Sequence, residues 1–107
     1  MPARPVTDAC WDADVLEAAE TVIVGFHAPS SSPCRAFQPI VDELAGDLVG
    51  RARVLAVDFE QNPAAGRRYE VSSLPTLLVF RHGQLRGRLV GARPKERLLA
   101  ELSPYLG

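Results

Sequence analysis

A continuous, mainly apolar run of the chain extends from Thr21 to Ala28. It is rich in β-branched and aromatic residues, which predicts a strand buried on both faces of a sheet. From Pro33 to Leu48 the apolar residues instead recur at spacings of three and four, as in an amphipathic helix, and Pro33 suits its first turn. The chain therefore forms a strand–loop–helix unit, with the strand buried, and we expect the rest of the fold to be organised around this unit.

Further elements follow from the same patterns and from turn residues. Helix-linked strands early in the chain pair in parallel, whereas a hairpin pairs its strands antiparallel. The predicted fold class is therefore α/β: a mixed central sheet, parallel in its N-terminal half and closed by an antiparallel hairpin, with helices on both faces. In chain order the other predicted elements are a short edge strand at 3–6, a helix at 11–19, a strand at 52–58, a short helix at 62–70, strands at 76–80 and 85–90 joined by a turn at His82-Gly83, and a last helix from Pro94.

Composition limits the classes of function. With 107 residues and a net charge of −1, we expect a single domain over residues 1–107, with no bulk attraction to nucleic acid or an anionic membrane. No apolar run reaches the ~20 residues that span a bilayer, and the N-terminal residues lack the apolar core of a secretory signal. Two cysteines do not make a disulfide framework, so we expect a cytoplasmic protein with both cysteines reduced. No metal-ligand spacing or phosphate-binding glycine loop is present, so no metal or cofactor is expected, and a monomer is the default.

Charge is distributed unevenly along the chain. Residues 1–66 carry ten acidic and four basic side chains, whereas residues 67–97 carry eight basic and two acidic ones. The simpler interpretation is two solvated faces. The functional alternative is a dipolar surface that orients an acidic partner.

The candidate chemistry centres on Cys34. It lies in the first turn of the predicted helix, where unpaired N–H groups and the helix dipole favour a thiolate. A dithiol site would place its second cysteine one helical turn earlier, and that position is Ser31. Oxygen cannot undergo thiol–disulfide exchange, and a serine hydroxyl has no accessible anion near neutral pH without a paired base. Cys34 is then either a small buried residue or a thiol that forms one mixed disulfide with a partner cysteine or glutathione.

Other arrangements of these residues are weaker candidates. His27 lies near Ser31 in the sequence, but a serine hydrolase needs a third group that orients the histidine, and none is evident. Cys10, near the start of the first predicted helix, is interpreted as structural. We expect the fold to hold Cys10 and Cys34 too far apart for a disulfide.

Six short motifs, in the right order, resemble the thioredoxin family over roughly residues 5–106. The resemblance implies the thioredoxin fold. The motifs are residues 22–29 (the strand before the redox loop), Ser31-Ser32-Pro33-Cys34 (where the family carries Cys-Gly-Pro-Cys), Asp58 with Gln61-Asn62-Pro63, Leu74-Pro75-Thr76 (the segment with the cis-proline), Phe80-Arg81-His82-Gly83 (the hairpin), and Val90-Gly91-Ala92 (the loop that completes the substrate groove).

The resemblance also implies the location of the site. Cys34 and Ser31 occupy the catalytic positions of a degenerate motif. A cis Leu74–Pro75 bond is expected to leave main-chain groups free to pair with an extended peptide. The expected groove for a protein or peptide partner consists of Ser30, Ser32, Pro33, Leu74, Pro75, Val90, Gly91 and Ala92.

The chain departs from the family at several chemically important positions. Ser31 replaces the exposed nucleophilic cysteine, and Gly25 occupies the position of the buried carboxylate that assists proton transfer. The two tryptophans that usually flank the loop correspond to His27 and Ser30. These departures favour a thioredoxin-like protein that lacks dithiol chemistry and binds proteins through the groove. The alternative is a protein thiol–disulfide oxidoreductase, either with a natural cysteine at position 31 that serine replaces in this sequence, or with monothiol exchange through Cys34.

Overall fold

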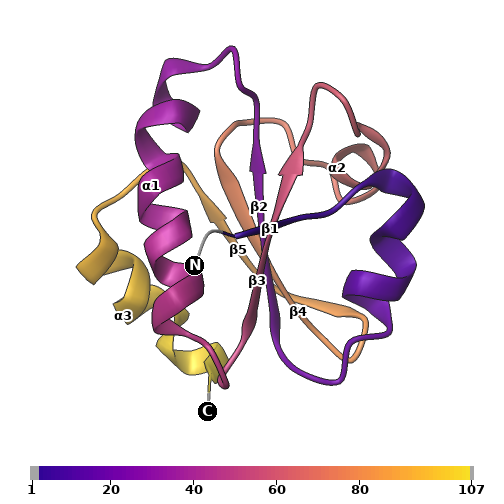
Figure 1. Cartoon of the computed structure of the whole chain (residues 1–107), viewed down its shortest axis with the longest axis vertical. Coiled ribbons are helices and arrows are strands. Elements are labelled where there is room, and N and C mark those ends of the chain that lie inside the picture. The colour runs from indigo at the N-terminus through magenta and orange to yellow at the C-terminus, as the bar shows by residue number, and fades with distance from the viewer. Residues whose placement is uncertain (1–2, 107) are drawn as a thin grey trace.

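The computed structural model describes residues 3–106. Within these residues five strands form one sheet, and three α-helices and an N-terminal helical segment pack on it (Figure 1). In chain order the elements are β1 (Arg4–Pro5), a 3₁₀ turn (Asp8–Cys10), a π-helical turn (Asp12–Leu16), β2 (Val22–His27), α1 (Ser32–Asp47), β3 (Arg53–Asp58), α2 (Ala64–Arg68), β4 (Thr76–Arg81), β5 (Gln84–Val90) and α3 (Lys95–Leu106).

The sheet has the predicted mixed topology. Its strand order is β1-β3-β2-β4-β5, with β3 parallel to both β1 and β2, and with β4 antiparallel to both β2 and β5. The apolar run of the sequence becomes β2, which lies in the middle of the sheet and is buried along nearly its whole length. The prediction of a strand covered on both faces is therefore confirmed.

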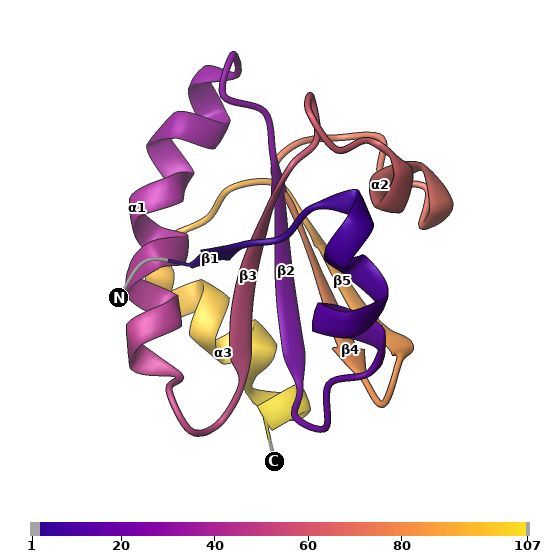
Figure 2. The ribbon, with the colours of Figure 1, turned by 45° about the vertical axis from the view of Figure 1, so that its right-hand side comes forward.

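Two apolar clusters cover the two faces of the sheet. Helices α1 and α3 pack on one face, and α2 with the N-terminal helical segment packs on the other (Figures 1 and 2). Trp11 lies in the second cluster, almost fully buried among the rings of Phe26, Tyr69 and Phe80. Trp11 therefore anchors the N-terminal helical segment to this face of the sheet.

The N-terminal helix differs from its prediction. The segment begins at Asp8 rather than Trp11, and it winds as a 3₁₀ turn followed by a π-helical turn that ends at Leu16. Thr7 accepts a hydrogen bond from the Cys10 amide, which starts the helical winding earlier than the apolar spacing indicated. The wider π turn is closed by the Glu17 amide, which donates to the Asp12 carbonyl.

The hairpin matches its prediction in position and turn chemistry. His82 and Gly83 have φ of 51° and 76°, the positive values that a two-residue type I′ turn requires. Beyond the turn, the pairing of β4 with β5 shifts register between Val79 and Phe80. Among residues 3–106, no helix is long and apolar enough to cross a membrane.

Candidate functional site

The predicted site residues gather at one end of the sheet. Phe26 of β2 pairs with Thr76 of β4, which pairs in turn with Val90 of β5, so these residues form a row across the sheet. Three segments leave the sheet from this row: the loop between β2 and α1, the Leu74-Pro75 segment before β4, and the Val90–Ala92 segment after β5. The fold therefore brings together segments that are more than 60 residues apart in the sequence, as the resemblance implies.

Two of these segments are joined directly by the backbone. The Leu74–Pro75 peptide bond is cis, in agreement with the expectation from the resemblance. The Gly91 amide donates a 2.9 Å hydrogen bond to the Pro75 carbonyl. Val90 exposes 51% of its surface beside this contact, and Leu74 is half-buried. The result is a partly apolar surface in which Pro75 itself is covered and its neighbours are accessible.

Ser31 and Cys34 meet at the start of α1. Ser31 is the N-cap of the helix, with extended backbone, and its hydroxyl accepts a hydrogen bond of 3.5 Å from the Cys34 amide. Pro33 follows in the first turn, as predicted. Cys34 is only 2% exposed, and its thiol is free. At this position Ser31 therefore satisfies a helix N–H group, and Cys34 is a buried thiol that forms no disulfide with Cys10, the other cysteine.

Two charged side chains that the sequence did not single out hold the loop before α1. Glu60 accepts hydrogen bonds from the Ser30 hydroxyl at 2.8 Å and from the Ser30 amide at 3.3 Å. On the other side, the Arg35 guanidinium donates to the Pro29 carbonyl at 2.9 Å and to the Ser32 hydroxyl at 3.1 Å. These charge-assisted bonds connect the loop to Glu60 on one side and to the first turn of α1 on the other. Arg35 could have been noticed from its position in the first helical turn, whereas Glu60 lies 30 residues from Ser30 and carries no local signal.

The third segment of the site is also held by a charged pair. Arg93 donates to the carbonyl groups of Val90 and Gly91, and its guanidinium binds both carboxylate oxygens of Glu101 at 2.6 and 2.8 Å. The Arg93 side chain is only 13% exposed. Because Glu101 belongs to α3, this contact anchors the Val90–Gly91 segment to the helix that covers the sheet.

The buried carboxylate that the resemblance leads one to expect on β2 is replaced by Gly25. Gly25 is buried on β2, and a Cβ atom added there would lie 3.2 Å from Leu77 Cδ2 and 3.6 Å from Val41 Cγ1. The third near neighbour is the Leu55 carbonyl oxygen at 3.8 Å, so the position lies between two aliphatic side chains and the backbone of β3, with no charged group among these neighbours. Within residues 3–106, no side chain makes a hydrogen bond to the Cys34 sulfur, so no base is arranged to take its proton.

The histidines do not complete a catalytic group. His27 ends β2 in register with Asp58 of β3, but no hydrogen bond or ion pair joins their side chains in the described part of the chain. His82 lies in the hairpin turn, at the end of the sheet opposite to Ser31. The structure therefore gives Ser31 no histidine as a base. Cys10 is exposed and free, on the N-terminal helical turn.

Two hollows flank the site. One, of about 190 Å³, reaches the Cys34 side chain, and the other, of about 260 Å³, lies between the segment before β4 and the exposed side of β5. The first is lined by His27, Ala28, Pro29, Cys34, Arg35 and Gln38. The second is lined by Glu70, Ser72, Ser73, Thr76, Arg88 and Val90.

The fold and the arrangement of these loops define a class. A mixed sheet of this topology, with a cysteine in the first turn of the helix after its central strand and a cis-proline at the same end, is that of thioredoxin-like proteins. The family model described as Thioredoxin matches residues 2–104, and the chain belongs to the thioredoxin family. It is 39% identical to a thioredoxin of Synechocystis sp. over 107 residues, which cover 99% of this chain and all of that protein. It is also 41% identical to a thioredoxin of Staphylococcus aureus strain Mu50 over 106 residues, again 99% of this chain and all of the relative.

Proposed function

We propose that this thioredoxin-family protein binds extended segments of partner proteins and does not reduce disulfides. The binding surface, called here the groove, consists of Ser30, Ser32, Pro33, Leu74, Pro75, Val90, Gly91 and Ala92. One observation carries the proposal. The residue one helical turn before Cys34 is Ser31, whose hydroxyl acts as the helix N-cap. The proposed compartment is the cytoplasm, in keeping with the expectation drawn from the sequence.

The chemistry of disulfide reduction explains why this substitution matters. One thiolate attacks the substrate disulfide and forms a mixed disulfide, and a second thiol must then displace the reduced substrate. With oxygen at position 31, only Cys34 could attack, and no second cysteine lies beside it to resolve the product. Attack by Cys34 is further slowed because its side chain is 2% exposed. Two electrons therefore cannot be delivered to the substrate in the usual sequence.

The groove has the features that peptide binding requires. Its walls are held in place by Glu60 and Arg35 on one side and by Arg93 on the other, so little ordering is needed when a partner binds. Val90 offers exposed apolar surface beside the cis Leu74–Pro75 bond. An extended segment could gain affinity from main-chain groups and specificity from the two flanking hollows.

The redox part of the proposal is tested by insulin reduction with dithiothreitol as the electron source. We compare the chain with Ser31→Cys and with Ser31→Cys/Cys34→Ser, which also carries one thiol in the motif. The chain and the double variant are expected to match the rate of dithiothreitol alone. Activity of Ser31→Cys would show that the fold still supports disulfide reduction and that the oxygen at position 31 alone prevents it. Catalysis by the unchanged chain would contradict the proposal.

The binding part is tested with a permanently extended protein, reduced and carboxymethylated α-lactalbumin. Val90→Glu is expected to weaken its binding at least about tenfold, because a charge would have to be desolvated at the contact. Val49→Glu is the matched control, since Val49 is also an exposed valine (69%) but follows α1 at the other end of the sheet. Equal effects of the two substitutions, or no binding by the unchanged chain, would overturn this part.

A second candidate is monothiol exchange through Cys34. It is favoured by one observation, the hollow of about 190 Å³ that Cys34 lines together with His27. Incubation with oxidised glutathione, followed by mass spectrometry, would detect the mixed disulfide. The comparison with Cys10→Ser assigns the adduct, because only Cys34 remains in that variant. An adduct on Cys34 that forms as fast as that on Cys10 would favour this candidate.

A further inference from the structure

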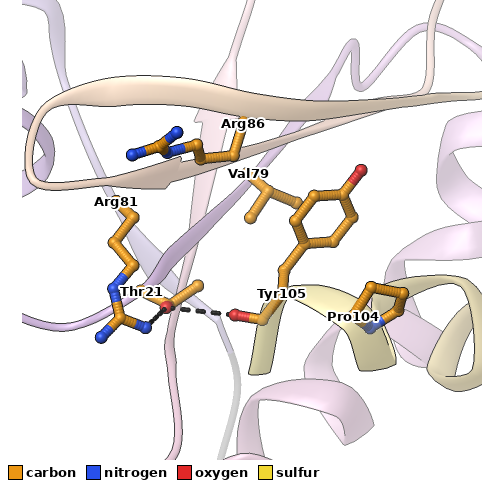
Figure 3. Close-up of a pocket in the computed structure, with 6 residues that line it drawn as sticks. All are labelled: Thr21, Val79, Arg81, Arg86, Pro104 and Tyr105. Atoms are coloured by element: carbon orange, nitrogen blue, oxygen red, sulfur yellow. Dashed lines mark hydrogen bonds between the residues drawn. The ribbon is translucent and has the colours of Figure 1, made fainter. Parts of the chain in front are cut away.

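A pocket of about 270 Å³ lies at the end of the sheet opposite to the groove. It opens where the end of α3 meets the β4–β5 hairpin and the start of β2 (Figure 3). Its apolar walls come from the Tyr105 ring, Val79 and Pro104, and its polar groups come from Thr21, Arg81 and Arg86. The volume is just below the ~300–1,000 Å³ of most ligand pockets, which suits a small molecule.

Arg86 reaches this pocket because of an irregularity in β5. Val79 pairs with Gly87, but the next residue of β4, Phe80, pairs with Leu85. Arg86 is therefore the extra residue of a β-bulge. In a regular strand Arg86 would share a face with Arg88, opposite to Gly87. The bulge places its side chain over the face of the hairpin that carries Val79 and Arg81, with its guanidinium on the Arg81 side, and the three residues line the pocket together (Figure 3).

The other polar wall is fixed by a buried threonine. Thr21 is only 3% exposed; its hydroxyl accepts a 3.2 Å hydrogen bond from Arg81 Nη1 and donates one of 3.4 Å to the Tyr105 carbonyl (Figure 3). Arg81 is thereby oriented while its remaining N–H groups stay available. A Cβ atom at Gly87 would lie 2.5 Å from the Tyr105 ring, so glycine is the residue that lets this ring pack on β5.

In the described part of the chain, the positive charges of the pocket have no acidic partner. Within residues 3–106, neither Arg81 nor Arg86 has a carboxylate within the 4.0 Å of an ion pair, and no acidic side chain lines the pocket. Other basic side chains of the same half of the chain, such as Arg93 and Lys95, are paired with acids. Two guanidinium groups beside an aromatic ring form a site for an anionic group carried on an apolar body.

We propose that this pocket binds a small organic anion, with a phosphate or carboxylate between Arg81 and Arg86 and an apolar part against Tyr105. The site is separate from the groove and does not depend on the proposed function. Phenyl phosphate is the probe, and benzoate and phenol are its carboxylate and neutral analogues. Titration is followed by the backbone amide resonances of the ¹⁵N-labelled chain. Saturable shifts are expected at Thr21, Arg81, Arg86 and Tyr105.

The variants separate a specific site from general attraction to a basic surface. Arg86→Gln is expected to raise the Kd for phenyl phosphate about tenfold, as for loss of one charge-assisted hydrogen bond. Arg67→Gln removes the same charge from an exposed arginine on α2 and should leave the Kd unchanged. Equal weakening by both variants, equal shifts with phenol, or no saturable binding of either anion at millimolar concentration would overturn the proposal. Binding of phenyl phosphate or benzoate alone would support it and identify the anionic group.

Discussion

Removal of the Arg93 guanidinium should loosen the groove and destabilise the whole domain. We consider Arg93→Met, which keeps an apolar stem of similar length but removes the charge and the donors. Exposed ion pairs contribute about 0–1 kcal/mol, whereas breaking a fully buried pair costs about 3–5 kcal/mol. The Arg93 and Glu101 side chains are 13% and 35% exposed, between these limits. The bonds from Arg93 to the carbonyls of Val90 and Gly91 are lost as well, so the expected loss of unfolding free energy is about 2–3 kcal/mol.

Urea unfolding measures this loss directly. For a small domain it should move the midpoint by roughly 1–2 M urea. Arg97→Met is the matched control, because Arg97 approaches the same Glu101 at 3.8 Å but is 71% exposed. We expect it to cost less than about 0.5 kcal/mol. A double-mutant cycle with Glu101→Gln isolates the Arg93–Glu101 coupling from the carbonyl contacts.

A second measurement places the effect in the groove. The Gly91 amide donates to the Pro75 carbonyl, and its hydrogen should exchange faster in Arg93→Met than in Arg97→Met. The two variants are compared at urea concentrations that give them the same free energy of unfolding. If both variants have the same stability, or if exchange at Gly91 is unchanged, Arg93 does not hold the wall of the groove.

Three further predictions concern buried and charged groups elsewhere. Gly25→Asp should lower the free energy of unfolding, measured in urea, by about 3 kcal/mol or more at pH 7 and by less near pH 4. The reason is that a buried, mainly aliphatic site disfavours the ionised carboxyl group. A similar loss in Gly25→Ala would show that the size of the side chain, and not its charge, is responsible. In native protein, Ellman's reagent should modify exposed Cys10 at least roughly tenfold faster than buried Cys34, and the fast phase should vanish in Cys10→Ser. Hydrogen bonds to Asp47 and then Glu43 raise the pKa of Lys95 above its ordinary 10.5. Its stabilising contribution relative to Lys95→Gln should therefore be fully present below pH 10.5 and disappear as the pH rises through the raised pKa; an advantage that persists above that range would refute the assignment.

The periodicity of apolar residues in the sequence was sufficient to predict the main helices and strands. The run that became β2 has no polar alternation because the strand is covered on both faces, and spacings of three and four identified α1. The positions of the cis bond and of the groove segments came from the resemblance, since no local pattern distinguishes a cis-proline from a trans one. The 3₁₀ and π winding of residues 8–16 was not predicted, because the apolar spacing of such short turns resembles that of a short α-helix.

The contacts that rigidify the site could not be predicted. Ser30 and Glu60 are 30 residues apart, and their contact depends on the parallel pairing of β2 with β3, which brings the two loops together. The bulge at Arg86 likewise depends on how the hairpin register meets the rest of the sheet. Such features arise from tertiary structure, and sequence spacing does not encode them.

The two outer strands of the sheet also affect how copies of the chain meet. β1 is only two residues long and contains Pro5, which offers no N–H group. β5 is longer, but its bulge and its exposed arginines interrupt the regular row of backbone donors and acceptors. Strands with these features are poor templates for a second sheet. We therefore expect the folded chain to resist edge-to-edge aggregation at high concentration, even though its central strands are among the most apolar segments of the sequence.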